Sequence, residues 1–286
     1  MKHLFTFLFF CLSLSVFAQE DLMSMLDDGT KEDAPVSATF KAVRIINGHS
    51  IETTRKNHLD FVINHRFGAL NSGYQNFWGL DQAQIRLGLE YGVSKNLMVG
   101  IGRSSHQKVI DMYFKYRLLT QTESGSMPVS LGLFASNAIT TLQSPNYNDG
   151  INRYAYTYQA LLARKFSESI SVQLTPTLIH RNLVQEKSDQ NTLFSMGIGG
   201  RCKLTKRTSV NFEYFWVPER GNQVVFRPMF SLGFDIETGG HVFQLHFTNS
   251  LGMIEKAFIA ETVGRWGKGD VLYGFNISRT FSLNRK

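Results

Sequence analysis

The alternation of apolar and polar residues is the feature that most constrains this chain. In Asp81–Val93, apolar side chains occupy every second position, and mostly polar or small residues fill the positions between them. A period of two is that of a β-strand with one apolar and one polar face, and helical periodicity cannot produce it. The same pattern recurs in Asp111–Leu118, Val210–Trp216 and Val271–Phe281. The chain is therefore predicted to be all-β.

Strand length separates a membrane protein from a soluble sandwich. Several alternating stretches run about 11 to 14 residues, whereas strands of soluble proteins usually have about 5 or 6. A tilted strand that crosses a bilayer needs about 9 to 11 residues. Only a closed barrel satisfies every backbone group in lipid without leaving an edge. We predict a transmembrane antiparallel up-and-down β-barrel, with twelve strands as the leading count in a range of about 10 to 14.

The connections between the expected strands mostly alternate between short and long, which is typical of bacterial barrels and places both termini in the periplasm. Ser105–Lys108 and Pro218–Asn222 are brief for external loops, and Thr120–Met127 is long for a periplasmic turn. The expected strands are 59–67, 80–93, 97–104, 109–119, 128–138, 152–165, 169–182, 191–204, 208–217, 223–237, 241–250 and 271–283.

Two further stretches could change the strand count. Thr39–Ile46 also alternates, but as a wall strand it would reverse the parity of every turn. We place it outside the barrel wall, in a periplasmic extension or in a plug within the lumen. Ala257–Thr262 could be another strand, and together with Thr39–Ile46 it would raise the count to about 14.

The N-terminus indicates export. Residues 1–18 combine a basic start, an apolar run of about 13 residues and a small-residue cleavage site, as in a secretory signal peptide. Cleavage leaves Cys202 alone, so no intramolecular disulfide can form, and it lowers the net charge from +7 to +6. Gln19–Ser37 is expected to be a tether with a possible short helix at Asp21–Leu26.

The expected organisation follows from these boundaries. It comprises the signal peptide (1–18), a periplasmic N-terminal segment or plug (19–58) and a barrel in the cell outer membrane (59–286).

The charged residues of the strands are expected in the lumen, because Arg or Lys facing lipid costs about 2 to 4 kcal/mol at the midplane. One interpretation is a salt-bridged, largely closed interior, and the other is a narrow channel whose basic excess of nine to six favours anions. His246 is expected on the same face as a hydrogen-bonded interior residue. The lumen-lining network is predicted to comprise Arg86, Glu90, Asp111, Lys115, Arg117, Arg181, Arg201, Glu213, Asp235, Glu237 and His246, with Asp60, Arg66, Lys165, Lys203 and Arg227 as further inward charges.

No pattern indicates catalysis, a metal or a cofactor, and we expect none of them. His241 and His246 are five residues apart on one strand, so they face opposite sides and cannot share a metal ion. The Lys and Arg residues are dispersed, which argues against nucleic acid and favours contact with membrane lipid. Aromatic girdles are expected from Trp78, Trp216, Trp266, Tyr154, Tyr156 and Tyr158.

Several runs closely resemble those of the membrane-bound β-barrel family known as domain of unknown function 5777. The resemblance covers about residues 39–283 and implies an outer-membrane barrel without an assigned activity. The runs that carry it are Phe230–Ser250, Gly79–Gly92, Met98–Arg103, His180–Val184 and Gly274–Arg279.

Three functions compete at this point. The leading hypothesis is a non-enzymatic barrel, either a porin-like narrow pore or a scaffold for a periplasmic protein that binds residues 21–50. The second is a lipid-modifying enzyme such as a hydrolase, for which Ser250 and His241 show no partner spacing. The third is a binding module for a hydrophobic ligand.

Overall fold

The computed structural model describes residues 33–184, 188–219, 225–238 and 241–283. The expected signal peptide and the possible helix Asp21–Leu26 lie outside the described residues. Within these ranges, no helix is long and apolar enough to cross a bilayer.

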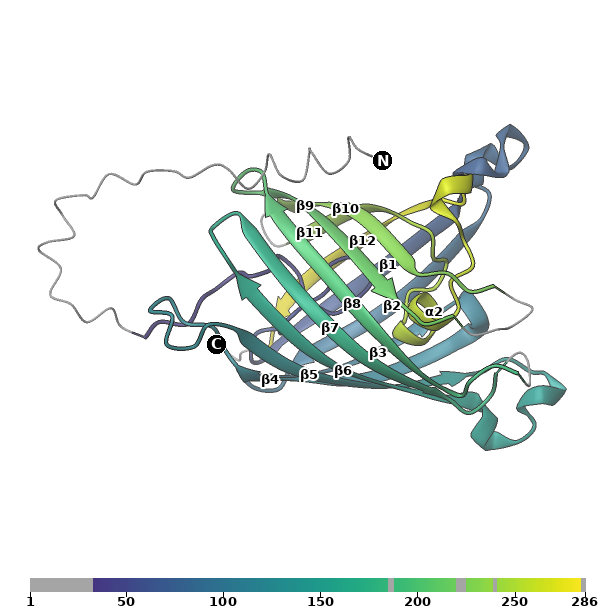
Figure 1. The fold of residues 1–286 in the computed structure, drawn as a ribbon, viewed down its shortest axis with the longest axis horizontal. Helices are drawn as coiled ribbons and strands as arrows, with labels where there is room; N and C mark the ends of the chain where they lie inside the picture. The colour runs from purple at the N-terminus through teal and green to yellow at the C-terminus, as the bar shows by residue number, and fades with distance from the viewer. Residues whose placement is uncertain (1–32, 185–187, 220–224, 239–240, 284–286) are drawn as a thin grey trace, which may run out of the picture.

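Twelve antiparallel strands form a closed barrel in the described chain (Figure 1). Each strand pairs with its sequence neighbours, and β1 pairs with β12 to complete the ring. The predicted fold class and strand count are confirmed. The strands are β1 (His58–Ala69), β2 (Ala83–Gly92), β3 (Leu97–Ser104), β4 (Val109–Leu119), β5 (Ser130–Thr140), β6 (Tyr154–Lys165), β7 (Ile170–Arg181), β8 (Thr192–Lys203), β9 (Thr208–Trp216), β10 (Met229–Thr238), β11 (His241–Thr248) and β12 (Leu272–Ser282).

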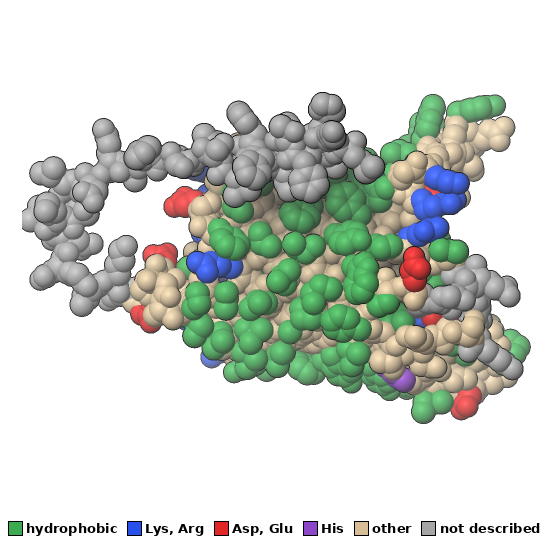
Figure 2. All heavy atoms as spheres, in the orientation of Figure 1, with side chains coloured by type: hydrophobic (Ala, Val, Ile, Leu, Met, Phe, Trp, Pro, Cys, Tyr) green, Lys and Arg blue, Asp and Glu red, His purple; other side chains and the backbone are tan. Residues whose placement is uncertain are grey.

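The period-two pattern divides the wall into an apolar outer face and a polar inner face. On β2, Leu87 and Leu89 are 43% and 44% exposed on the outside, whereas Arg86 and Glu90 are 0% and 1% exposed inside. Figure 2 shows hydrophobic side chains over the visible wall, with charged groups gathered toward the two ends. This distribution suits a wall that contacts lipid outside and polar groups inside.

The two ends of the barrel differ. At the short-turn end, on the left in Figure 1, lie the tight connections, the first described residues and the C-terminal end of β12. The loop end carries the longer connections. They include the 3-10 helices η2 (Leu70–Ser72), η3 (Tyr74–Gly79), η4 (His106–Lys108), η5 (Pro145–Tyr147), η6 (Gly150–Arg153) and η7 (Trp266–Lys268), and the helix α2 (Glu255–Ala260).

The long turn after β4 has a structural reason. Its backbone pairs with the N-terminal segment, since Val36 N–H donates to the Gln121 carbonyl at 2.7 Å and Glu123 N–H donates to the Ala34 carbonyl at 2.9 Å. The hydroxyl of Ser124 also donates to the Asp33 carboxylate at 2.5 Å. The extra length therefore provides a docking edge for the tether.

Two expectations about the last third of the chain are wrong. Ala257–Thr262 is not a strand, because Glu255–Ala260 forms α2, whose six residues are all buried. Arg227 is not on the inner wall, because β10 begins only at Met229 and leaves Arg227 exposed in the preceding loop. Pro228 has no N–H to contribute to a strand ladder, which accounts for the late start.

Residues 38–57 lie outside the wall but inside the barrel, as Figure 1 shows for the segment that enters from the short-turn end. They include all of Thr39–Ile46, and Phe40, Ile45 and Ile46 are each no more than 3% exposed. We call residues 38–57 the plug.

The outer face predicts a depth-dependent response to charge. Leu174→Lys, in the middle of β7 and 41% exposed, should destabilise the barrel by about 2 to 4 kcal/mol, because the ammonium would face hydrocarbon. Ile170→Lys, at the strand end on the same face, should cost no more than about 1 kcal/mol. Urea unfolding in lipid vesicles measures both. Equal costs would contradict the assignment of this face to lipid.

Candidate functional site: the filled lumen

The plug contains a tight hairpin whose tip lies among the inward side chains of the wall. Arg44 and His49 form a β-bridge, and Ile45 N–H donates to the Gly48 carbonyl at 2.9 Å. Ser50 N–H donates to the Val43 carbonyl at 2.8 Å. The hairpin satisfies only some of its own backbone groups, and the rest of the plug has little regular structure. The remaining backbone groups of the plug therefore need partners from the wall.

Inward side chains of the wall supply those partners as hydrogen-bond donors. The Lys115 ammonium alone donates to three plug carbonyls, including that of Ser50 at 2.9 Å. Because these donors come from strands all around the barrel, the plug is fixed from several sides. The pairs are Lys115 with Val43, Ser50 and Glu52; Arg201 with Ala38 and Thr39; Gln173 with His49; Gln244 with Arg44 and Ile45; and Asn276 with Ile46.

Glu213 of β9 holds the hairpin tip. Its carboxylate accepts the backbone N–H groups of Ile46, Asn47 and Gly48 at 3.0, 2.8 and 3.0 Å. Three successive N–H groups around one anion form a backbone nest, and bonds to a charged acceptor are stronger than neutral ones. The Glu213 side chain therefore fixes both the position and the turn of the tip.

Apolar packing also holds the plug against one side of the lumen. The plug residues Phe40, Ile45, Ile46 and Ile51 form one buried cluster with inward residues of β3 to β6. The wall members are Met98, Tyr113, Phe134, Leu161 and Ala163.

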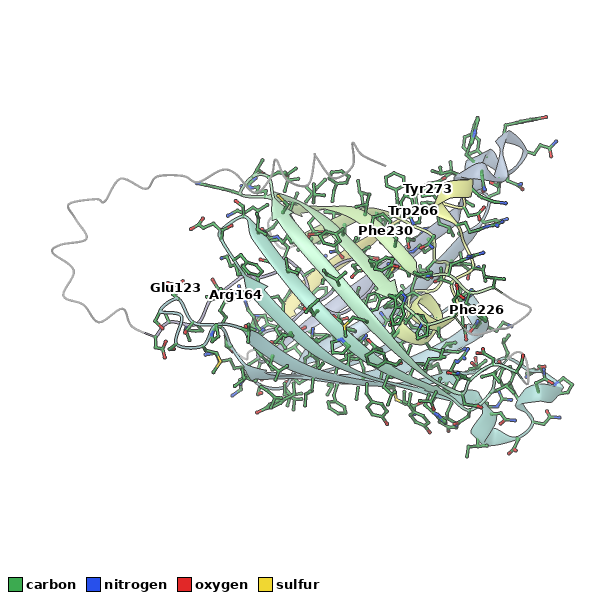
Figure 3. All side chains as sticks on the ribbon, viewed as in Figure 1. Glu123, Arg164, Phe226, Phe230, Trp266 and Tyr273 are labelled. Atoms are coloured by element: carbon green, nitrogen blue, oxygen red, sulfur yellow. The ribbon has the colours of Figure 1, made fainter. Side chains whose placement is uncertain are left out.

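The loop between β11 and β12 closes the other end. Its residues 249–264, which we call the lid, carry α2 into the barrel mouth. Phe258 and Ile259 pack in an apolar cluster with Ile179, Phe215 and Met229 of the wall. Behind the lid, the Trp266 indole N–H donates to the Phe230 carbonyl at 2.9 Å, and Figure 3 shows the two residues side by side.

Plug and lid meet at a buried carboxylate. Glu255 Oε1 lies 3.5 Å from Arg44 Nη1 and 3.8 Å from His49 Nε2. Burial raises the pKa of Glu255, and the Arg44 charge acts in the opposite direction. Burial lowers the pKa of His49, and nearby cationic side chains lower it further, so this imidazole is neutral at pH 7. The Arg44–Glu255 pair is thus the ionic link between the two elements.

Some residues of the predicted lumen network bind within the wall or its loops. Arg86 donates to the two Asp111 oxygens at 2.9 and 2.5 Å. Arg181 donates to Asp189 at 2.9 Å. Glu90 accepts the Tyr113 hydroxyl at 2.5 Å, Asp235 accepts bonds from Ser209 and Gln244, and His246 contacts Arg66.

The other predicted residues hold the plug. Lys115, Arg201 and Glu213 bind its backbone. Arg117 pairs with Glu52 at 3.4 Å, and Glu237 pairs with Lys41. Sequence patterns indicated the inward face of these residues and left open whether Thr39–Ile46 is a plug in the lumen, but they did not pair any of these residues with it.

The residues considered for catalysis do not come together. His241 begins β11 and Ser250 follows its other end, about 30 Å apart along an extended chain. His241 stacks on Phe243, and His65 stacks on Phe275, as expected of outward-facing residues. Within the described part of the chain, no group of three His, Cys, Asp or Glu residues is placed to hold a metal ion.

Two cavities flank the filled lumen. One, of about 830 Å³, lies at the short-turn end between the plug and strands that include β1, β11 and β12, and its lining includes Lys41, Arg44, Glu90 and Arg117. The other, of about 600 Å³, is an apolar groove on the outer wall with Met112, Phe114 and Tyr158 in its lining. Binding of a hydrophobic ligand stays a prediction.

Glycine is required where the plug joins the wall. Lys56 forms a bridge to Gly92 at the end of β2. A Cβ on Gly92 would collide with the Arg55 carbonyl group, so only glycine lets the plug backbone approach the wall this closely.

The bonds between Glu213 and the hairpin tip predict that loss of the carboxylate makes the tip more mobile. Glu213→Gln should speed hydrogen exchange at the amides of Ile46, Asn47 and Gly48 by about tenfold or more, because three charge-assisted bonds are weakened. Mass spectrometry or NMR in detergent measures this. Glu90→Gln is the matched control, since Glu90 accepts a wall hydroxyl instead. Equal exchange in both variants would contradict the role of Glu213.

Several solved structures of outer-membrane proteins are similar to this chain. The NanC porin matches with a TM-score of 0.52 at 8% identity, over 77% of this chain and 98% of that one. An outer membrane channel from Pseudomonas putida F1 matches with a TM-score of 0.49 at 15% identity, over 81% and 98% of the two chains. Omp33 of Acinetobacter baumannii gives a TM-score of 0.43 at 8% identity, over 79% and 99%. The likeness to the NanC porin concerns the fold alone.

The family of the chain follows from its sequence. No curated protein matches it. The family model described as a membrane-bound β-barrel domain, domain of unknown function 5777, matches residues 40–281, which span both the plug and the wall. The chain belongs to this family of membrane-bound β-barrels.

Proposed function

We propose that the protein is a non-enzymatic outer-membrane pore that its plug and lid hold closed. One observation carries the proposal: the plug fills the lumen and binds chiefly to inward polar side chains of the wall. A polar inner face costs free energy unless it has polar partners. A wall with this inner face therefore suits a lumen that holds either the plug or aqueous solute.

The size of the barrel supports a narrow passage. Barrels of about 8 strands are filled by their own side chains, whereas those of 16 to 18 strands leave an aqueous channel. Twelve strands lie between these limits. The cavity of about 830 Å³ reaches the plug from the short-turn end and would be the vestibule of the pore.

The charges exposed by plug movement favour anions. Lys115, Lys165 and Arg201 donate to plug or tether carbonyls and would lose those partners. Among the wall carboxylates, Glu213 and Glu237 would lose theirs. Cations lining a narrow pore attract anions.

A periplasmic partner would act through the tether. Residues 39–50 lie inside the barrel, so Asp33–Ser37 is the described part of the expected 21–50 segment that a partner can reach. Its bonds to the β4–β5 turn are at the short-turn end. A protein that bound there would pull on the plug along the barrel axis.

Conductance tests the pore. In planar bilayers the wild-type protein should conduct rarely, and Glu213→Gln should raise the open fraction by about tenfold, in line with a loss of about 1.4 kcal/mol from the closed state. Glu90→Gln should behave like wild type. If folded Glu213→Gln protein carries no ion current, the pore hypothesis is refuted.

Reversal potentials test the selectivity. In a KCl gradient, the Glu213→Gln pore should favour chloride, and adding Lys115→Gln should reduce that preference because one inner cation is lost. Lys203→Gln removes an inner charge for which no plug contact is seen, and it should change the preference less. A cation-selective pore would refute the anion assignment.

A further inference from the structure

The lid is latched at the loop end by residues that do not touch the plug. Lys256 Nζ donates to Gln107 Oε1 at 2.8 Å, and Gln107 Nε2 donates to Glu261 Oε2 at 2.8 Å. Gln107 therefore bridges the first and last turns of the α2 region. It occupies the left-handed region with φ of 55°, and the adjacent Lys108 has φ of 48°. Non-glycine residues adopt this conformation at a cost, so the contacts with the lid help to hold the loop in place.

The inner surface of the lid reaches the plug hairpin. Arg44 and His49, which are bridged across the hairpin, both approach the same oxygen of Glu255. Arg44 also donates to the Asn47 carbonyl at 2.7 Å, and Asn47 lies in the tip that Glu213 holds. A continuous set of contacts therefore runs from Gln107 through α2 and Glu255 to the tip of the plug.

Burial makes this connection sensitive to displacement. The side chains of Arg44 and Glu255 are each 5% exposed, and that of His49 is fully buried. The Arg44 Nε and Nη2 atoms have no hydrogen-bond partner among the described residues. Moving Glu255 away would leave the Arg44 charge buried without its counter-ion, which is strongly unfavourable. Moving out of its buried position would then lower the free energy of the hairpin.

We propose that the lid and the plug form one coupled gate, in which displacement of α2 at the loop end releases the plug through Glu255. This regulation rests on the proposed pore, because it assigns the control of that pore to a contact with the outside.

A double-mutant cycle on the full chain tests the coupling. Hydrogen exchange at the Ile45 and Ser50 amides reports on the hairpin, and exchange at the Phe258 and Glu261 amides reports on α2. Gln107→Ala should speed exchange at both sites by about fivefold to tenfold. Glu255→Gln should speed hairpin exchange by a similar factor. The double variant should exchange no faster in the hairpin than Glu255→Gln alone, because the coupling contact is already lost.

Two controls keep the outcome clear. Arg153→Gln alters another loop-end contact, to the Thr140 and Leu142 carbonyls, and should leave the hairpin unchanged. Lys256→Gln is a second latch variant that should reproduce Gln107→Ala.

The coupling and the pore can fail separately. Faster exchange in α2 with an unchanged hairpin, or effects that multiply in the double variant, would overturn the coupling. If exchange is coupled but the protein never conducts, the coupling of lid and plug stands and the pore hypothesis is refuted.

Discussion

Every backbone polar group needs a hydrogen-bond partner, and this requirement determines both the wall and the filling of the barrel. In the wall, lipid offers no partners, so twelve strands pair with one another and close into a ring. Inside the ring, the irregular plug cannot satisfy itself, and side chains of the wall take the place of a neighbouring strand. The inner face of the barrel is thus built around the carbonyls and N–H groups of its own N-terminal segment.

The closure combines two kinds of interaction with different geometry. Apolar clusters hold the lid against Phe215 and Met229 and the plug against Tyr113 and Phe134. Such contacts tolerate small shifts. The bonds that Glu213 accepts from backbone N–H groups and that Lys115 donates to backbone carbonyls are directional and define one position of the hairpin. Together they make a closed lumen with a single arrangement of its polar contacts.

The wall could be predicted from the sequence because the alternation that defines each strand lies within a few neighbouring residues. Alternation in Ala83–Gly92 fixes the face of each side chain within one strand, and most strand ends were placed within about two residues. Arg227 was misplaced because the pattern was continued across Pro228. The pattern of Ala257–Thr262 also allows a strand, because the residues of α2 are buried on all sides, which removes the polar face that distinguishes a helical pattern.

The sequence allowed a plug in the lumen but could not decide for it or assign its contacts, because those contacts are non-local. The sequence placed Glu213 and Lys115 on the inner face, but the same charges suit a salt-bridged interior, an anion channel or a plug. Ile46 and Glu213 are 167 positions apart, and Ile46 and Asn276 are 230 apart. No spacing rule joins residues at such separations, so the partner of each inward charge was open until the fold brought them together.

The same separations bear on how the chain assembles. The plug is synthesised before the wall, and Arg66 of β1 binds its tip at Asn47, yet the other strands that bind the tip, β9 to β12, come last. Before the end of the barrel forms, the hairpin has only its contacts with earlier strands, such as those to Lys115 and Gln173, and closing a loop of this length costs conformational entropy in advance of the remaining contacts. Because the plug lies next to the β1–β12 seam through Asn276, its arrival and the closure of the ring involve the same strand. The last contacts of the plug with the wall thus depend on the last strands of the chain.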